Sequence, residues 1–227
     1  MSQNPDEKIQ GLVFDCDGTL ADTMPLHWRA WQLISQRHRL RFPKDRFYAL
    51  GGVPSRDILK LLATEQGRTL DYIAVAHEKE EAYLPLMAEV KPIQAVVQIA
   101  RENFGKIPLA VASGGTQPII VAVLEHLKIR DLFAAVVTSE MVRHQKPAPD
   151  IFLEAARRIG VPPQFCRGYE DTELGLASIR SAGMDAVDVR TLLETGERLK
   201  GETANGQRPL WAERRSDLQS LWRRLGL

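Results

Sequence analysis

Residues 9–19, IQGLVFDCDGT, join an apolar run to two carboxylates. The run 9–14 predicts a buried strand, so Asp15 and Asp17 stand at the carboxyl end of a strand, where an open α/β sheet carries its chemistry. Residues two apart share one side of an ideal strand, but a chain that leaves the sheet at Gly18 can splay them. One carboxylate could then hold a metal while the other handles protons, and an ordinary acidic turn is the alternative.

The composition of the 227 residues, 44% of them hydrophobic, suits a packed core in one large domain or in a core with a smaller insert. Lysine and arginine total 30 against 29 aspartates and glutamates, which leaves no global field that would favour nucleic acid or an anionic membrane. Residues 1–8 are polar, and no apolar run approaches the roughly 20 residues that span a bilayer. We therefore expect a cytoplasmic protein without nucleic-acid or membrane partners.

Two cysteines, Cys16 and Cys166, are too few for a disulfide framework or a cysteine-based zinc site. Both lie in apolar, strand-like surroundings. We interpret them as small buried hydrophobic residues.

Short β-branched runs alternate with longer helical patterns, which predicts a parallel sheet covered by helices. The expected strands are 9–14, 107–112, 134–138, 165–169 and 186–189. Between the first two, apolar residues recur at helical spacing over 26–40, 56–66 and 70–87, separated by Pro43, Gly51-Gly52 and Gly67. We predict an α/β core of residues 1–23 and 90–227 with a helical insert, 24–89.

The end of the chain, about 205–227, has its own helical pattern. Apolar residues recur there along one helical face, at Trp211, Leu218, Leu221, Trp222 and Leu225. We expect this tail to dock on its own core, with a contact to a second copy or a partner as the alternative. A monomer or a weak homodimer is expected.

Each later strand is followed by polar residues that a phosphate site could use. Ser113-Gly114 offers a hydroxyl and backbone N–H groups that could bind an oxyanion. The alternative is that this segment is an ordinary helix cap. Lys146 stands just before a new helix, where a surface lysine is the commoner case. Glu170-Asp171 suits Mg²⁺, which prefers oxygen ligands, although acids also favour a helix start.

Taken together and in this order, these segments resemble the haloacid dehalogenase-like superfamily of phosphatases. Its four motifs match residues 15–19 (DCDGT), Ser113, Lys146 and Glu170-Asp171, and the resemblance covers residues 12–189. It implies a Rossmann-like parallel sheet, with the helical insert acting as a mobile cap over the active site.

The resemblance also assigns roles. It implies that Asp15 is the nucleophile that forms an aspartyl-phosphate, and that Asp17 protonates the leaving oxygen and then activates water. Ser113 and the Gly114 N–H would hold the phosphoryl oxygens, and Lys146 would offset charge between phosphate and carboxylates.

The implied cofactor is Mg²⁺. Its ligands would be the Asp15 carboxylate, the Asp17 backbone carbonyl and Asp171, with Glu170 acting indirectly or through water. An acid at position 17 favours phosphoryl transfer, because dehalogenases need no proton donor for their leaving group.

Narrower resemblance points to phosphatases of small, fructose-1-phosphate-like sugar phosphates. Cap residues His27, Arg56 and Lys79 would then contact substrate, although each can also be an ordinary helix-surface residue. The alternative is a phosphosugar mutase of the β-phosphoglucomutase type. The mutase pattern has a Ser-Lys-Asn run after the second-motif serine, and residues 115–117 read Gly-Thr-Gln here. A non-catalytic phosphosugar-binding or phospho-aspartate signalling module is the third possibility.

Overall fold

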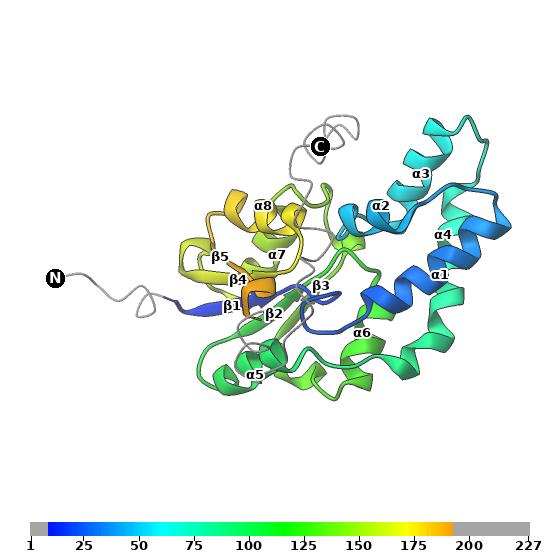
Figure 1. Ribbon diagram of the computed structural model, residues 1–227. Helices are drawn as coiled ribbons and strands as arrows, with labels where there is room; N and C mark the ends of the chain where they lie inside the picture. The colour runs from blue at the N-terminus through cyan, green and yellow to red at the C-terminus, as the bar shows by residue number, and fades with distance from the viewer. Residues whose placement is uncertain (1–8, 193–227) are drawn as a thin grey trace.

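The computed structural model describes residues 9–192, and within them five parallel strands form one sheet in the order β3-β2-β1-β4-β5 (Figure 1). The strands are β1 (Gly11–Phe14), β2 (Leu109–Ala112), β3 (Ala135–Val137), β4 (Cys166–Glu170) and β5 (Asp185–Asp188). All five predicted strands are confirmed, and the sheet is parallel as predicted. β1 lies at the centre, between β2 and β4, so the first motif starts from the middle of the sheet.

Helices cover both faces of this sheet. They are α5 (Gln94–Asn103) and α6 (Gln117–His126) on one face, and α7 (Asp150–Ile159) and α8 (Glu173–Ser181) on the other. Successive side chains of a strand point to opposite faces, so Leu12 and Phe14 pack in the first layer and Val13 packs in the second. Burial on both sides explains why β1, β2 and β3 are continuous apolar runs rather than alternating ones, whereas the edge strand β5 is only partly buried.

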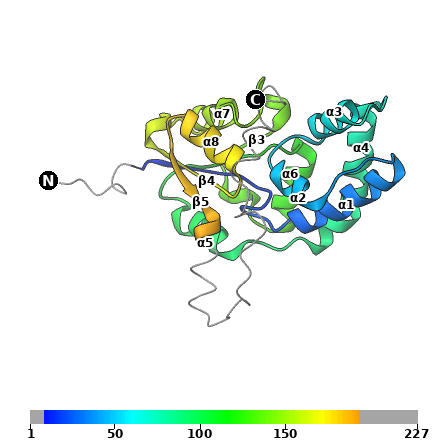
Figure 2. The ribbon, with the colours of Figure 1, turned by 45° about the horizontal axis from the view of Figure 1, so that its top comes forward.

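The insert between β1 and β2 is helical and has its own apolar core. Its elements are α1 (Met24–Arg37), α2 (Lys44–Ala49), α3 (Ser55–Glu65), α4 (Tyr72–Tyr83) and the 3₁₀ helix η2 (Leu84–Glu89). The largest buried side chains of this core include Trp31, Ile34, Phe47 and Leu62. Figure 2 shows the insert to one side of the sheet, beyond the ends of the strands. The boundaries 24–89 stay a prediction.

The chain leaves and re-enters the core at neighbouring points. The Asp22 N–H donates to the Lys91 carbonyl at 2.8 Å, and Ala21 and Pro92 form an isolated bridge. Two adjacent crossings allow the insert to be added without disturbing the sheet.

Two details of the insert differ from the sequence pattern. The short helix α2 was not predicted as a separate element. The helix expected over 70–87 changes to 3₁₀ geometry after Tyr83, because Pro85 has no N–H to continue the α-helical bonding. Both cysteines are free and buried, as predicted.

Three further 3₁₀ turns join the core elements: η3 (Arg130–Leu132), η4 (Ser139–Met141) and η5 (Pro163–Phe165). Over residues 9–192, no helix has the length and apolar character needed to cross a membrane. The helical tail predicted over about 205–227, like the polar segment 1–8, lies outside the described residues.

Candidate active site

The predicted motif residues meet at the carboxyl edge of the sheet. Asp15 follows β1, Ser113 follows β2, and Glu170 ends β4. Because β2 and β4 pair with opposite sides of β1, their ends lie on either side of Asp15. The sheet therefore gathers side chains that lie more than 150 residues apart in the sequence.

Gly18 follows the two carboxylates of the first motif, Asp15 and Asp17, and turns the chain after them. Its φ of 86° lies in the left-handed region, and a Cβ at this position would stand 2.4 Å from a carboxylate oxygen of Asp171. The turn sends Asp15 towards Lys146 and Glu170, whereas Asp17 faces the insert. The predicted splaying is present.

Asp15, Glu170 and Asp171 form an acidic cluster in which one carboxylate oxygen of each lies within 4.8 Å of the others. Burial raises the pKa of Asp15 to about 7 against the opposing effect of Lys146, and burial followed by the charge of Glu170 raises the pKa of Asp171 well above its usual range. Crowded, poorly hydrated carboxylates of this kind fit a hard divalent cation, which would relieve their repulsion. The Asp17 side chain is not part of the cluster.

Lys146 is the cation that the protein itself supplies to this cluster. Its side chain is 1% exposed, and Nζ lies 2.7 Å from Asp15 Oδ1 and 2.9 Å from Glu170 Oε1. Burial alone would lower its pKa, but these two carboxylates hold the pKa above the usual range of lysine. Lys146 is therefore charged at neutral pH, as its predicted role requires.

Asp17 is surrounded by donors instead of acids. Its Oδ1 accepts a 2.6 Å hydrogen bond from the Thr23 hydroxyl and lies 3.3 Å from His27 Nε2. Burial by itself would raise the pKa of Asp17, but the bonds from His27 and Thr23, together with the charge of Lys79, lower it to about 2. Asp17 is thus ionised in this state.

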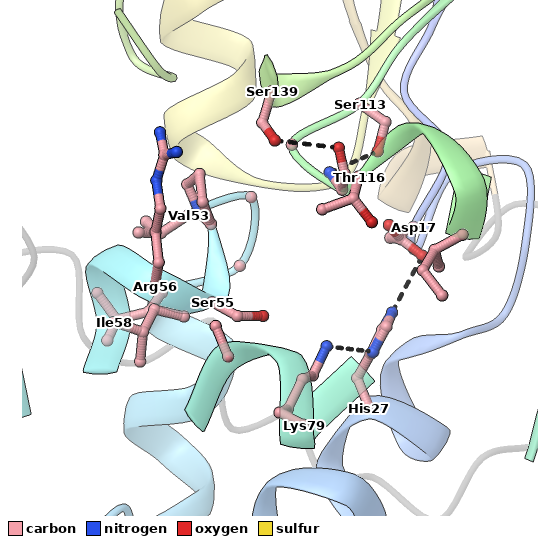
Figure 3. Close-up of a pocket in the computed structure, with 18 of the residues that line it drawn as sticks. Asp17, His27, Val53, Ser55, Arg56, Ile58, Lys79, Ser113, Thr116 and Ser139 are labelled. Atoms are coloured by element: carbon pink, nitrogen blue, oxygen red, sulfur yellow. Dashed lines mark hydrogen bonds and ion pairs between the residues drawn. The ribbon is translucent and has the colours of Figure 1, made fainter. Parts of the chain in front are cut away.

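His27 and Lys79 form one continuous polar chain with Asp17. Lys79 Nζ lies 3.0 Å from His27 Nδ1 and can only donate, which assigns the ring proton of a neutral His27 to Nε2, facing Asp17 (Figure 3). Burial, followed by the charge of Lys79, lowers the pKa of His27 and favours this neutral form. Lys79 also donates to Glu80 at 3.1 Å, and the His27 ring stacks on Tyr83 at 4.1 Å.

The loop after β2 forms a small-residue cradle against the insert. Ser113 is buried, and its hydroxyl oxygen accepts a hydrogen bond from the Gly115 N–H at 3.1 Å. A Cβ added to Gly114 would lie 2.6 Å from the carbonyl oxygen of Gly52, so the insert closes directly onto this loop. Glycine at position 114 permits that approach.

A cavity of about 340 Å³ lies between the core and the insert. The cluster residue Asp15, together with Asp17 and Ser113, lines its core side. His27 and Lys79 line the cap side. Arg56 lies on the wall opposite Asp17, with a side chain 50% exposed and Nε 3.6 Å from Asp57 Oδ1 (Figure 3).

Comparison with known proteins identifies the family of this chain. The sequence pattern of the haloacid dehalogenase-like hydrolases matches residues 9–183. The chain belongs to this family. As a haloacid dehalogenase-like hydrolase it is 40% identical to the fructose-1-phosphate phosphatase YqaB of Escherichia coli, over 82% of this chain and 99% of that protein.

Two further similarities place this haloacid dehalogenase-like hydrolase among its relatives. It is 32% identical to the β-phosphoglucomutase of Bacillus subtilis over 80% of this chain and 83% of that one. The crystal structure of CbbY from Rhodobacter sphaeroides in complex with phosphate has a TM-score of 0.71 and 26% identity, over 78% of this chain and 84% of the other. The predicted family and the fold are therefore confirmed.

Three residues of this hydrolase's site were not singled out from the sequence. Thr23 bonds to Asp17, Thr19 donates to Asp171 Oδ1 at 3.0 Å, and Glu80 accepts from Lys79. Thr19 is part of the first motif and could have been assigned from it. Thr23 occupies the N-cap position of α1, and its hydroxyl donates to Asp17 and makes no capping bond.

Proposed function

We propose that this chain is a Mg²⁺-dependent phosphatase of small sugar phosphates that acts through an aspartyl-phosphate on Asp15. One observation carries the proposal: two carboxylates, two residues apart, face one cavity in opposite surroundings. Asp15 lies among acids and a lysine, whereas Asp17 lies among hydrogen-bond donors. A nucleophile beside a metal and a separate proton carrier are the two groups that this reaction needs.

In the first step, an oxygen of Asp15 would form a bond to phosphorus while the bond from phosphorus to the sugar oxygen breaks. The leaving oxygen would take a proton from Asp17. Because the hydrogen bonds at Asp17 keep it ionised in this state, it must take up that proton as the substrate binds.

In the second step, Asp17 would accept a proton from water as the water oxygen attacks phosphorus and Asp15 is released. Ser113 and the Gly114 N–H would hold the phosphoryl oxygens, and Lys146 would balance the negative charge. Mg²⁺ held by Asp15, Asp171 and Glu170 would supply further charge neutralisation.

The substrate that we propose first is fructose 1-phosphate. The cavity volume of about 340 Å³ falls in the range of small-molecule sites. The relative from Escherichia coli, 40% identical to this chain, is a fructose-1-phosphate phosphatase. Arg56, His27 and Lys79 are the cap residues that we propose to select the sugar.

A mutase is the second candidate, because a β-phosphoglucomutase is 32% identical to this chain. A mutase must bind a second phosphate remote from the nucleophile. The loop Gly115-Thr116-Gln117 offers no cation for that phosphate, which favours hydrolysis.

Phosphate release from a panel of sugar phosphates, with Mg²⁺ and with EDTA, tests the proposal. We expect Mg²⁺-dependent release, and loss of turnover with a retained fold in Asp15→Asn. Asp131→Asn, an exposed aspartate outside the site, is the matched control and should keep full activity.

Three other results would contradict the proposal. Substantial turnover by Asp15→Asn would exclude the covalent step. Bisphosphate-dependent interconversion of glucose 1- and 6-phosphate would establish the mutase. Binding of sugar phosphates without turnover would indicate the non-catalytic module.

A further inference from the structure

The cavity wall next to the phosphate cradle carries an acid to which the proposed mechanism gives no role. Glu140 lies on η4, directly after β3, and lines the cavity together with Thr116 and Ser139. Figure 3 shows these two neighbours beside Ser113 on the core side of the cavity. Glu140, an exposed residue, therefore lies on the cavity wall beside the residues proposed to hold the phosphoryl group.

Glu140 occupies the start of helix α6. Its Oε2 accepts a hydrogen bond from the Gln117 N–H at 2.9 Å and another from the Thr138 hydroxyl at 2.9 Å. The second residue of the helix is Pro118, which has no N–H. A helix start normally attracts anions through its free N–H groups. Here one donor is absent and another is already bonded to a carboxylate.

The cations of the opposite wall are also paired with acids. Among the described residues that line the cavity, the lysine and arginine side chains are those of Lys79 and Arg56. Lys79 is bonded to His27 and Glu80, and Arg56 faces Asp57 at 3.6 Å. A second phosphate in this cavity would compete with a carboxylate for either cation, and it would meet the Glu140 charge at the helix start.

We propose that Glu140 is a specificity-determining residue that excludes a second phosphate from the cavity and so selects sugar monophosphates over bisphosphates. The inference rests on the proposed function, because it concerns the distal end of the same substrate. In addition to repelling a phosphate, the Glu140 carboxylate can accept a hydrogen bond from a sugar hydroxyl, and the described residues offer no partner to its Oε1.

The test compares fructose 1-phosphate with fructose 1,6-bisphosphate, which differ only in the distal phosphate. The measured quantity is the ratio of kcat/KM for the bisphosphate to kcat/KM for the monophosphate. Glu140→Gln keeps an oxygen acceptor for Gln117 and Thr138 but removes the charge, so we expect this ratio to rise about tenfold. Glu140→Ala, which also frees the Gln117 N–H, should raise the ratio at least as much.

The matched control is Glu125→Gln, which removes the same charge from an exposed position at the other end of α6. Its ratio should equal that of the wild type. An unchanged ratio in both Glu140 variants, or an equal rise in Glu125→Gln, overturns the inference and leaves the phosphatase assignment intact. A wild type that hydrolyses the bisphosphate as fast as the monophosphate also overturns it. A wild type that releases phosphate from no monophosphate overturns the proposed function and this inference with it.

Discussion

Replacing Lys146 by methionine tests whether one ammonium group holds the acidic cluster together. Lys146 is 1% exposed and bonds to Asp15 at 2.7 Å and to Glu170 at 2.9 Å. Methionine has a similar unbranched shape, so Lys146→Met removes the charge without leaving a large cavity. The measured effect will therefore report on electrostatics rather than on lost packing.

The magnitude follows from the burial of both partners. Their side chains are 5% and 1% exposed, so neither carboxylate gains much hydration when the lysine is removed. Removing one partner of a buried ion pair costs about 3–5 kcal/mol, because the remaining charge is left uncompensated. A domain has about 5–15 kcal/mol of stability, so we expect Lys146→Met to fold but to unfold at a clearly lower urea concentration.

The assay is urea unfolding followed by circular dichroism, in EDTA and again in Mg²⁺. We expect the loss of about 3–5 kcal/mol in EDTA. In Mg²⁺ the loss should shrink, because a bound cation neutralises the same carboxylates. Lys60→Met, an exposed lysine on α3, is the control and should change stability by less than about 0.5 kcal/mol.

Two results would refute this reasoning. A loss below about 1 kcal/mol in EDTA would mean that Lys146 does not compensate the cluster. An equal loss with and without Mg²⁺ would mean that the metal does not bind these carboxylates. Adding Glu170→Gln to Lys146→Met should recover part of the lost stability, because one of the two uncompensated charges is then removed.

Three further predictions concern other parts of the molecule. Thr23→Val removes one of the hydrogen bonds that keep Asp17 ionised, so the pKa of Asp17 should rise and the pH dependence of kcat should shift to higher pH without unfolding of the protein; an unchanged pH profile would contradict this. Gly114→Ala places a Cβ 2.6 Å from the Gly52 carbonyl oxygen, so the insert cannot close against the loop. The value of kcat/KM should therefore fall at least about tenfold. Wild-type kinetics in this variant would show that closure is not needed. On helix α7, hydrogen bonds from Arg157 and Arg158 lower the pKa of Glu154 to about 2. Ionised Glu154 therefore stabilises the fold at a pH above its ordinary pKa, and this stabilisation is lost as the pH falls towards 2. Glu154→Gln should therefore cost less than about 1 kcal/mol at pH 7, with a difference from wild type in urea unfolding that shrinks in acid; a difference that grows in acid would contradict the sign.

The sheet could be predicted from the sequence because burial on both faces leaves an unmistakable pattern. Strands β1, β2 and β3 are short apolar runs, and polar residues follow each of them. Helix α2 could not be predicted as easily, because it has six residues and, among them, Phe47 alone is buried. A helix of that length shows less than two turns of periodicity, and tertiary packing decides whether it forms.

The same contrast applies to the candidate site. Asp15, Ser113 and Asp171 could be predicted to meet, because the carboxyl ends of neighbouring parallel strands share one edge. Glu80 and Glu140 could not, because each also bonds to a residue of another element, Glu80 to Ser55 on α3 and Glu140 to Gln117 on α6, and the sequence does not fix that packing. A glutamate in the middle of a helical pattern is interpreted as a solvated surface residue until its partner is known.

The opposite surroundings of Asp15 and Asp17 have different structural origins. Those of Asp15 come entirely from the α/β core, through Lys146 and the end of β4. Those of Asp17 come largely from the insert, because His27 and Lys79 lie on α1 and α4. Opening of the insert would leave the metal and phosphate half of the site intact but would take His27 and Lys79 away from Asp17, so that the pKa of Asp17 would return towards that of an ordinary aspartate. Closure of the cap therefore sets the surroundings of the residue proposed to carry the proton, whereas the surroundings of the proposed nucleophile are complete within the core.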